Sequence, residues 1–126
     1  MIINEVIFGN VVSKANHYQA TRHGIIKDAI IRAYERSFAR QCQHKGANIN
    51  VPFVLDIRVF YETSKNDLDN SIKTILDCLQ DNGVISNDNL CVEIRAKKGF
   101  DSKNPRAIIS VETIQNEINF ENDLNC

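Results

Sequence analysis

Aspartates gather in one short stretch of this chain, residues 64–89, which reads SKNDLDNSIKTILDCLQDNGVISNDN. Asp67 and Asp69 stand two residues apart where an extended segment is expected to run into a helix. Alternate residues of extended backbone point to the same side, so the two carboxylates repel each other at a cost of roughly 3 kcal/mol. A hard divalent cation such as Mg²⁺, which prefers oxygen ligands, would remove that repulsion. The alternative is that Asp69 or Asn70 only caps the helix.

A lysine and two further acids follow this pair. Lys73 comes four residues after Asp69, and Asp77 four residues after Lys73, so a helix would place all three on one face. They are either exposed ion pairs, worth a few tenths of a kcal/mol, or a lysine held beside a metal to neutralise a phosphate. Asp88 is either a turn aspartate or a third carboxylate that the returning chain brings alongside the first two.

Hydrophobic periodicity predicts the elements that must position these acids. Apolar positions with strand character predict four strands, at 2–8, 51–62, 90–98 and 106–114. Helical spacing predicts a long helix over 25–43 and a shorter one that starts near the acids and stops at Asp81-Asn82-Gly83. The order β-α-β-α-β-β predicts an α/β (α+β) fold, a small mixed sheet with two helices packed on it. We expect residues 9–24 to form a long loop, or a strand tail and a loop, and the last two strands to form an antiparallel hairpin.

Length and composition limit the class of protein. The 126 residues predict one domain over 1–114, followed by a polar acidic tail over 115–126. No apolar run approaches the roughly 20 residues that cross a bilayer, and the N-terminus lacks a basic segment typical of a signal peptide. The four cysteines fit neither a zinc knuckle nor a disulfide framework, so we expect reduced thiols and a cytoplasmic protein with no membrane partner.

The stretch NDLDNSIKTILDCLQDNGVISNDN resembles the signature of the RusA family of Holliday-junction resolvases. Those enzymes show D-x-D-N, a lysine four residues after the second aspartate, an apolar helix with another aspartate, and then G-[VL]-[IL]-x-[DN]-D. The interval from Asp69 to Asp88 also matches. The stretch SKANHYQATRHG is similar to the family's polar N-terminal loop. The chain departs from the pattern at Asn66, where a basic residue is common, and at Asn87, where many members have a second aspartate.

The resemblance implies a RusA-like fold and a homodimeric endodeoxyribonuclease. Such an enzyme binds four-way DNA junctions and resolves them by paired symmetric nicks, in recombination and repair; its relatives are often carried by prophages. The implied cofactor is Mg²⁺, with Mn²⁺ as a substitute, and no organic cofactor is implied. Position by position, Asp67, Asp69 and Asp88 become the metal ligands, and together with Lys73 they form the catalytic set.

DNA contacts must come from other residues, because carboxylates repel phosphate. Polar residues of the first loop and the expected helix start, with a lysine pair near the expected hairpin, are the candidates: Lys14, Asn16, His17, Arg22, Lys27, Lys97 and Lys98. The alternative for each one is a solvated surface side chain.

Two other functions fit the same letters. A catalytically silent module with this fold would bind branched DNA without Mg²⁺-dependent nicking, although three acids facing phosphate would not help such a binder. An unrelated domain whose acids only bind a structural metal would gain thermal stability from Mg²⁺ but bind no nucleic acid.

Overall fold

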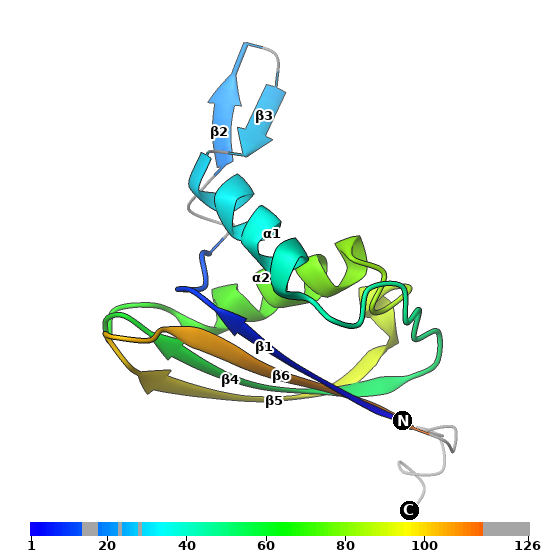
Figure 1. Cartoon of the computed structure of the whole chain (residues 1–126). Helices are drawn as coiled ribbons and strands as arrows, with labels where there is room; N and C mark the ends of the chain where they lie inside the picture. Colours follow the sequence, from blue (N-terminus) through cyan, green and yellow to red (C-terminus); the bar gives the residue numbers. More distant parts are fainter. Residues whose placement is uncertain (14–17, 23, 28, 115–126) are drawn as a thin grey trace, which may run out of the picture.

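A four-stranded mixed sheet forms the body of the protein. The computed structural model describes residues 1–13, 18–22, 24–27 and 29–114. The sheet has the strand order β1-β6-β4-β5 (Figure 1). β6 pairs antiparallel with both of its neighbours, and β4 and β5 are parallel. The strands are β1 (Ile2–Phe8), β4 (Phe53–Tyr61), β5 (Cys91–Phe100) and β6 (Arg106–Thr113).

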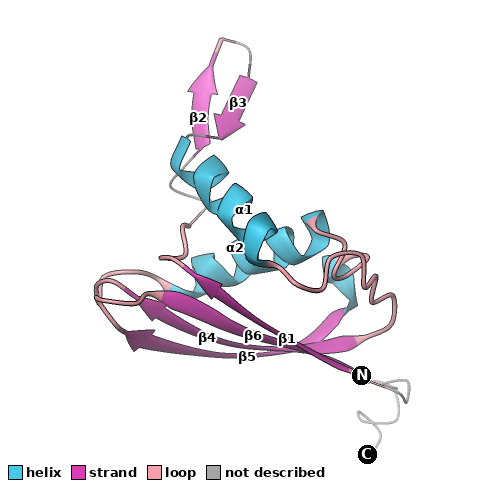
Figure 2. Cartoon of the chain, viewed as in Figure 1, coloured by secondary structure: helices cyan, strands magenta, loops and turns pink. Residues whose placement is uncertain are grey.

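Both helices cover the same face of this sheet. α1 (Ala29–Gln41) and α2 (Leu68–Asp81) lie on one side of the strands in Figure 2. Every second residue of β4 is fully buried beneath them, together with Phe38 of α1 and Leu79 of α2. Burial of each such side chain stabilises the fold by roughly 1.5–3 kcal/mol. The mixed sheet with two packed helices, predicted from the periodicity, is confirmed.

The opposite face of the sheet is uncovered in the part of the chain that the structure describes (Figure 1). Even-numbered residues of β1, β4 and β6 point to this side, since their odd-numbered neighbours are buried. On β1 the even positions include the exposed apolar residues Ile2, Val6 and Phe8.

The N-terminal part of the chain differs from the prediction. A second, two-stranded sheet of β2 (Tyr18–Thr21) and β3 (Gly24–Lys27) occupies the region expected to be a loop and the start of a helix. The predicted helix 25–43 therefore begins only at Ala29. The adjacent apolar residues Ile25 and Ile26 satisfy helical spacing, but they pair with β2 instead.

The predicted hairpin of the last two strands is wrong. β5 and β6 are not neighbours, because β4 lies between them. Residues 101–105 connect the two, and five extended residues reach about 16 Å, more than the roughly 10 Å across two strand spacings. The chain can therefore pass the end of β4 and return in the centre of the sheet, where Ile109 and Val111 become buried.

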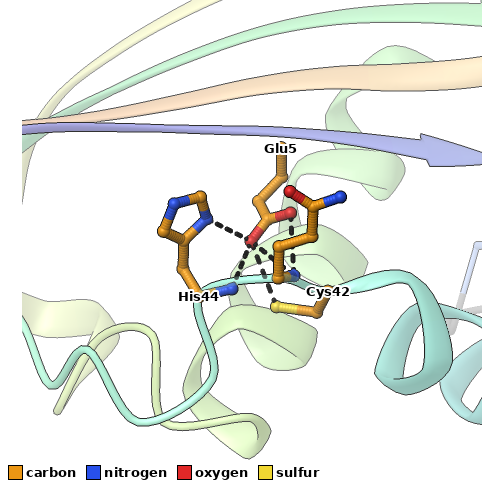
Figure 3. A network of polar contacts seen from close by, with 4 residues as sticks. Glu5, Cys42 and His44 are labelled. Atoms are coloured by element: carbon orange, nitrogen blue, oxygen red, sulfur yellow. Dashed lines mark hydrogen bonds and ion pairs between the residues drawn. The ribbon is translucent and has the colours of Figure 1, made fainter.

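A buried carboxylate ties β1 to the segment that follows α1 (Figure 3). Glu5, only 4 % exposed, accepts hydrogen bonds from the backbone N–H groups of Gln43 (3.0 Å) and His44 (2.8 Å). His44 Nδ1 lies 2.8 Å from the same carboxylate, and Cys42 Sγ lies 3.4 Å away. Burial acts to raise the pKa of Glu5, but these hydrogen bonds outweigh it and lower the pKa.

Two further observations concern the described residues. Among the described cysteines, Cys42, Cys78 and Cys91 form no disulfide, and Cys126 lies outside the described residues. Among the described helices, none is both long and apolar enough to cross a membrane.

Candidate active site

The first turn of α2 carries the two acids that the sequence singled out. Asp67 is the N-cap residue, with extended backbone (φ −94°, ψ 125°), and its side chain makes no capping hydrogen bond. Asp69 stands in the first turn, and its Oδ1 accepts a 3.0 Å bond from the N–H of Asn70. Both residues are exposed. The positive end of the helix dipole favours acids here, but capping does not explain the Asp67 carboxylate, because that carboxylate caps nothing.

A buried tyrosine of the sheet contacts the start of α2. The Tyr61 hydroxyl, at the end of β4, donates a 3.3 Å hydrogen bond to the carbonyl of Asp67 and contacts the Ser71 hydroxyl. Burial raises the pKa of Tyr61, and the negative charges of Asp67 and Asp69 raise it further, so the hydroxyl stays protonated and can donate. The hydrogen-bonded pair of Tyr61 and Ser71 was not predicted from the sequence. The signal was Ser71, a polar residue four positions before Ile75 on the apolar stripe of α2.

Lys73 joins α2 to Asp88. Its Nζ lies 3.0 Å from Asp77 Oδ1 and 3.2 Å from Asp88 Oδ2. Both carboxylates raise the pKa of Lys73 through their hydrogen bonds, and the bond to Asp77 has the larger effect. Lys73 is therefore positively charged at neutral pH. Asp88 lies on the side of the sheet that α2 covers, because Lys73 belongs to α2.

Asp88 is held by the start of a 3₁₀ turn, η2 (Asp88–Leu90). Its backbone N–H donates to Gln80 Oε1 at 2.9 Å. Asn87, where many family members have an aspartate, caps the turn by accepting a 2.9 Å bond from the N–H of Asn89. Asparagine is as good a cap as aspartate, so this departure from the family pattern keeps the turn.

The carboxylate oxygens of these acids are suitable ligands for a divalent cation, although the structure does not bring three of them together at one point. Within the described part of the chain, no three His, Cys, Asp or Glu side chains lie close enough together to hold a metal ion. Asp88 is engaged by Lys73, whereas Asp67 and Asp69 have no ion pair with any described residue. Mg²⁺ commonly uses one or two carboxylates and completes its shell with water and substrate phosphate. Asp67 and Asp69 provide that donor set.

The lysine pair of β5 is divided between the two faces of the sheet. Lys98 Nζ donates a 2.8 Å bond to the Ser64 carbonyl and lies 5.8 Å from the centre of the Tyr61 ring, beside the loop that leads to Asp67. Lys97 aligns with Arg58 and faces the uncovered side. Only Lys98 therefore lies on the side of the acids.

The remaining predicted DNA contacts fall in the N-terminal region. Arg22 is exposed in the turn between β2 and β3. Of Lys27 the structure describes only the backbone, and Lys14, Asn16 and His17 lie outside the described residues.

The segment that leads to these residues is anchored beside the acids. Asn10 Oδ1 accepts from the N–H of Glu62 at 3.0 Å, and the carbonyl of Val12 accepts from Thr74 Oγ1 at 2.8 Å. Val12 therefore lies beside α2.

Comparison with known proteins identifies the family of the chain. The sequence model of the family described as Endodeoxyribonuclease RusA matches residues 9–112, a range that includes both helices, β4, β5 and the acids at 67, 69, 77 and 88, but not β1. A protein named crossover junction endodeoxyribonuclease RusA, from Aquifex aeolicus (strain VF5), is 29 % identical over 108 residues, which cover 82 % of this chain and 86 % of that relative. The chain belongs to the RusA family of endodeoxyribonucleases.

Proposed function

We propose that this protein is a Mg²⁺-dependent endodeoxyribonuclease that resolves four-way DNA junctions by paired symmetric nicks, in recombination and repair. Family membership and the name of the Aquifex aeolicus relative support the reaction and the substrate. The observation that carries the proposal is the pair of exposed carboxylates, Asp67 and Asp69, without an ion-pair partner in the described chain and one helical turn before Lys73. Mn²⁺ is expected to replace Mg²⁺.

Each residue of the site has a separate task in this proposal. Asp67 and Asp69 would hold the cation, Asp88 would be a further ligand, and Lys73 would contact the scissile phosphate. A divalent ion in such a site lowers the pKa of a bound water and offsets the charge that develops on the phosphate. The water oxygen bonds to phosphorus as the bond to the 3′ oxygen breaks, which leaves a 5′-phosphate and a 3′-hydroxyl.

Positioning comes from residues that support the first turn of α2 and the loop before it. The hydrogen bond from the Tyr61 hydroxyl holds the carbonyl of Asp67 in place and so fixes the orientation of the start of α2. Lys98 holds the Ser64 carbonyl in the preceding loop. Preorganised charges of this kind contribute more to catalysis than charges that must reorient during the reaction.

Two symmetric cuts require two copies of the site, so the active particle is a homodimer in this proposal. DNA contact outside the site falls to Lys98, Arg22 and the polar stretch that follows Val12. Such contacts are mostly to phosphate, independent of sequence and sensitive to salt.

A nicking assay tests the proposal. The full chain is incubated with a synthetic four-way junction and with a linear duplex, with Mg²⁺ and with a chelator. We expect paired nicks in the junction only, with Mg²⁺ only, and none from Asp69→Asn, which should still bind the junction. Junction binding without Mg²⁺-dependent cutting by the wild-type protein would instead identify a silent binding module. Mg²⁺-dependent nicking by Asp69→Asn would remove this residue from the mechanism.

A further inference from the structure

One end of the uncovered sheet face is positively charged. The strand register sets Lys97 of β5 beside Arg58 of β4, and both side chains are exposed. Neither side chain forms an ion pair with a described residue. Like charges at directly neighbouring positions of two strands repel each other. An anion bound to Arg58 and Lys97, which we call the basic end, would relieve this repulsion.

An open pocket of about 270 Å³ lies at the basic end and is lined by Arg58, Phe60, Lys97, Lys98 and Gly99. A Cβ at Gly99 would lie 2.7 Å from the Phe60 ring, so the absence of a side chain there lets the ring lie against β5. The Arg106 guanidinium lies 4.1 Å from the centre of the same ring and is bonded to Asp101, so its charge is already balanced. The pocket therefore combines the two cations of the basic end with an aromatic wall.

The other end of the same face carries acids. Asp56, Glu93 and Glu112 lie in the half of the face where β4 begins. Arg95, also in that half, is bonded to Glu93 at 2.9 Å. These carboxylates would repel a polyanion, so they would confine it to the half of the face where β4 ends.

The basic end lies close to the candidate active site, on the opposite side of the sheet. The Tyr61 hydroxyl, at the end of β4, donates to the carbonyl of Asp67 on the helix-covered side. β5 is an edge strand, and Lys98 donates to the Ser64 carbonyl on that same side. The successive residues Lys97 and Lys98 therefore present positive charge on both sides of one sheet edge, beside the loop that leads to Asp67.

We propose that the basic end binds phosphates of a junction arm that leaves the active site around the β5 edge of the sheet. The inference rests on the proposed function and extends the DNA contact to a face on which the candidate metal-binding acids do not lie. DNA is the occupant because the positive charge continues around β5 from the loop beside the acids. Neighbouring strands lie about 4.8 Å apart, so Arg58 and Lys97 can bind one phosphate together.

The task of such a contact is to position the arm. Phosphate contacts fix the orientation of a protein on DNA and carry no sequence information. Each phosphate neutralised by a lysine or arginine releases bound counter-ions, so the affinity falls as salt rises, with a slope of about 0.9 in log K against log salt for each contact. The basic end is therefore expected to contribute to the affinity for the junction and to its salt dependence.

The affinity of the full chain for a labelled four-way junction, measured by fluorescence anisotropy in a salt series with a chelator present, tests the proposal. Lys97→Gln and Arg58→Gln should each weaken binding several-fold at about 100 mM salt and reduce the salt slope by about 0.9. The double variant should lose at least about tenfold. Arg95→Gln removes one positive charge from the same strand and the same face, two positions before Lys97, and is the matched control. It should leave both the affinity and the slope unchanged.

Three outcomes would overturn this inference alone, provided that the wild-type protein still nicks the junction with Mg²⁺. The first is wild-type affinity and slope in the Lys97→Gln and Arg58→Gln proteins. The second is an equal loss in Arg95→Gln, which would show only an effect of net charge. The third is a loss of affinity accompanied by a smaller particle mass in sedimentation, which would assign the two cations to assembly. A wild-type protein that neither binds nor nicks the junction would instead end both this inference and the proposed function.

Discussion

Two groups of carboxylates in this protein contrast sharply. Glu5 is buried and saturated, with two backbone N–H groups and a histidine ring nitrogen directed at it. Asp67 and Asp69 are exposed, and the only hydrogen bond to either side chain from a described residue comes from the N–H of Asn70. Both groups lie at helix ends, Glu5 beside the end of α1 and the aspartates at the start of α2.

The difference separates a structural acid from a functional one. A buried charge is retained only when hydrogen bonds repay its desolvation, and Glu5 meets that condition. Two exposed acids two residues apart repel each other, and the part of the chain that the structure describes supplies no cation to relieve them. A cation from solution is the missing partner, so substitutions in the two groups should have opposite effects.

The largest effect is expected from Asp67→Asn. Loss of one metal-binding carboxylate should reduce the single-turnover nicking rate on a four-way junction by at least about 100-fold. Asparagine is an equally good N-cap, so the melting temperature should stay within a few degrees of the wild-type value. If the variant nicked at the wild-type rate, Asp67 would be an ordinary N-cap residue. Asp67 could then no longer be contrasted with Glu5 as a functional acid.

Glu5→Gln is expected to do the reverse. The amide keeps one acceptor oxygen but replaces the other with an NH2 donor that faces donors, and buried donors without acceptors cost roughly 2–3 kcal/mol. For a chain of this size, the melting temperature should fall by roughly 10 °C. Nicking per folded molecule, measured well below that temperature, should change less than twofold. Loss of cutting by a well-folded Glu5→Gln protein would show that this carboxylate is part of the chemistry.

Ser71→Ala lies between these extremes. It removes a buried hydroxyl beside Tyr61, at a cost of about 1 kcal/mol in stability. With the first turn of α2 less firmly held, the Mg²⁺ concentration for half-maximal nicking should rise several-fold. Saturating Mg²⁺ should restore most of the rate, an outcome that loss of a catalytic group would not give. Thr74→Ser, which keeps the hydroxyl that bonds Val12, is the matched control and should leave the Mg²⁺ dependence unchanged.

The smallest effect is a pH dependence at Glu5. Its pKa in the folded protein is lowered from the ordinary value of 4.5, so its contribution to stability is complete above that value. The contribution is lost as the pH falls through the lowered pKa. Urea unfolding from pH 7 to pH 3 should therefore show the difference between wild type and Glu5→Gln shrinking only below about pH 4.5. A difference that stayed constant to pH 3 would mean that folding does not shift the pKa of Glu5.

The sequence predicted the elements whose side chains bury in one simple pattern. The range 2–8 was correct to the residue for β1, and β4 lies within the predicted 51–62. Strand pairing was harder to predict, because the alternation in β6 is the same whether β5 or β4 is its neighbour. The spacing of Ile25 and Ile26 fits a helix, but in the structure they pair with β2. β2 has too few apolar residues to be predicted as a strand from the sequence.

The site was predictable in its residues more than in its contacts. Spacing within one helix placed Lys73 beside Asp77, because the α-helix has a fixed geometry. The bond between Lys73 and Asp88 depends on the 3₁₀ turn and on Gln80, which spacing does not specify. The contact of the Tyr61 hydroxyl with Asp67 and Ser71 could not be predicted, because a tyrosine in an alternating strand is usually an ordinary core residue.

A crystal of the protein grown or soaked with Mn²⁺ tests the central claim most directly. Anomalous scattering should show the ion bound between Asp67 and Asp69, with Asp88 released from Lys73 and turned toward it. Manganese bound elsewhere, with Asp67 and Asp69 still facing only water, would contradict the proposed metal site.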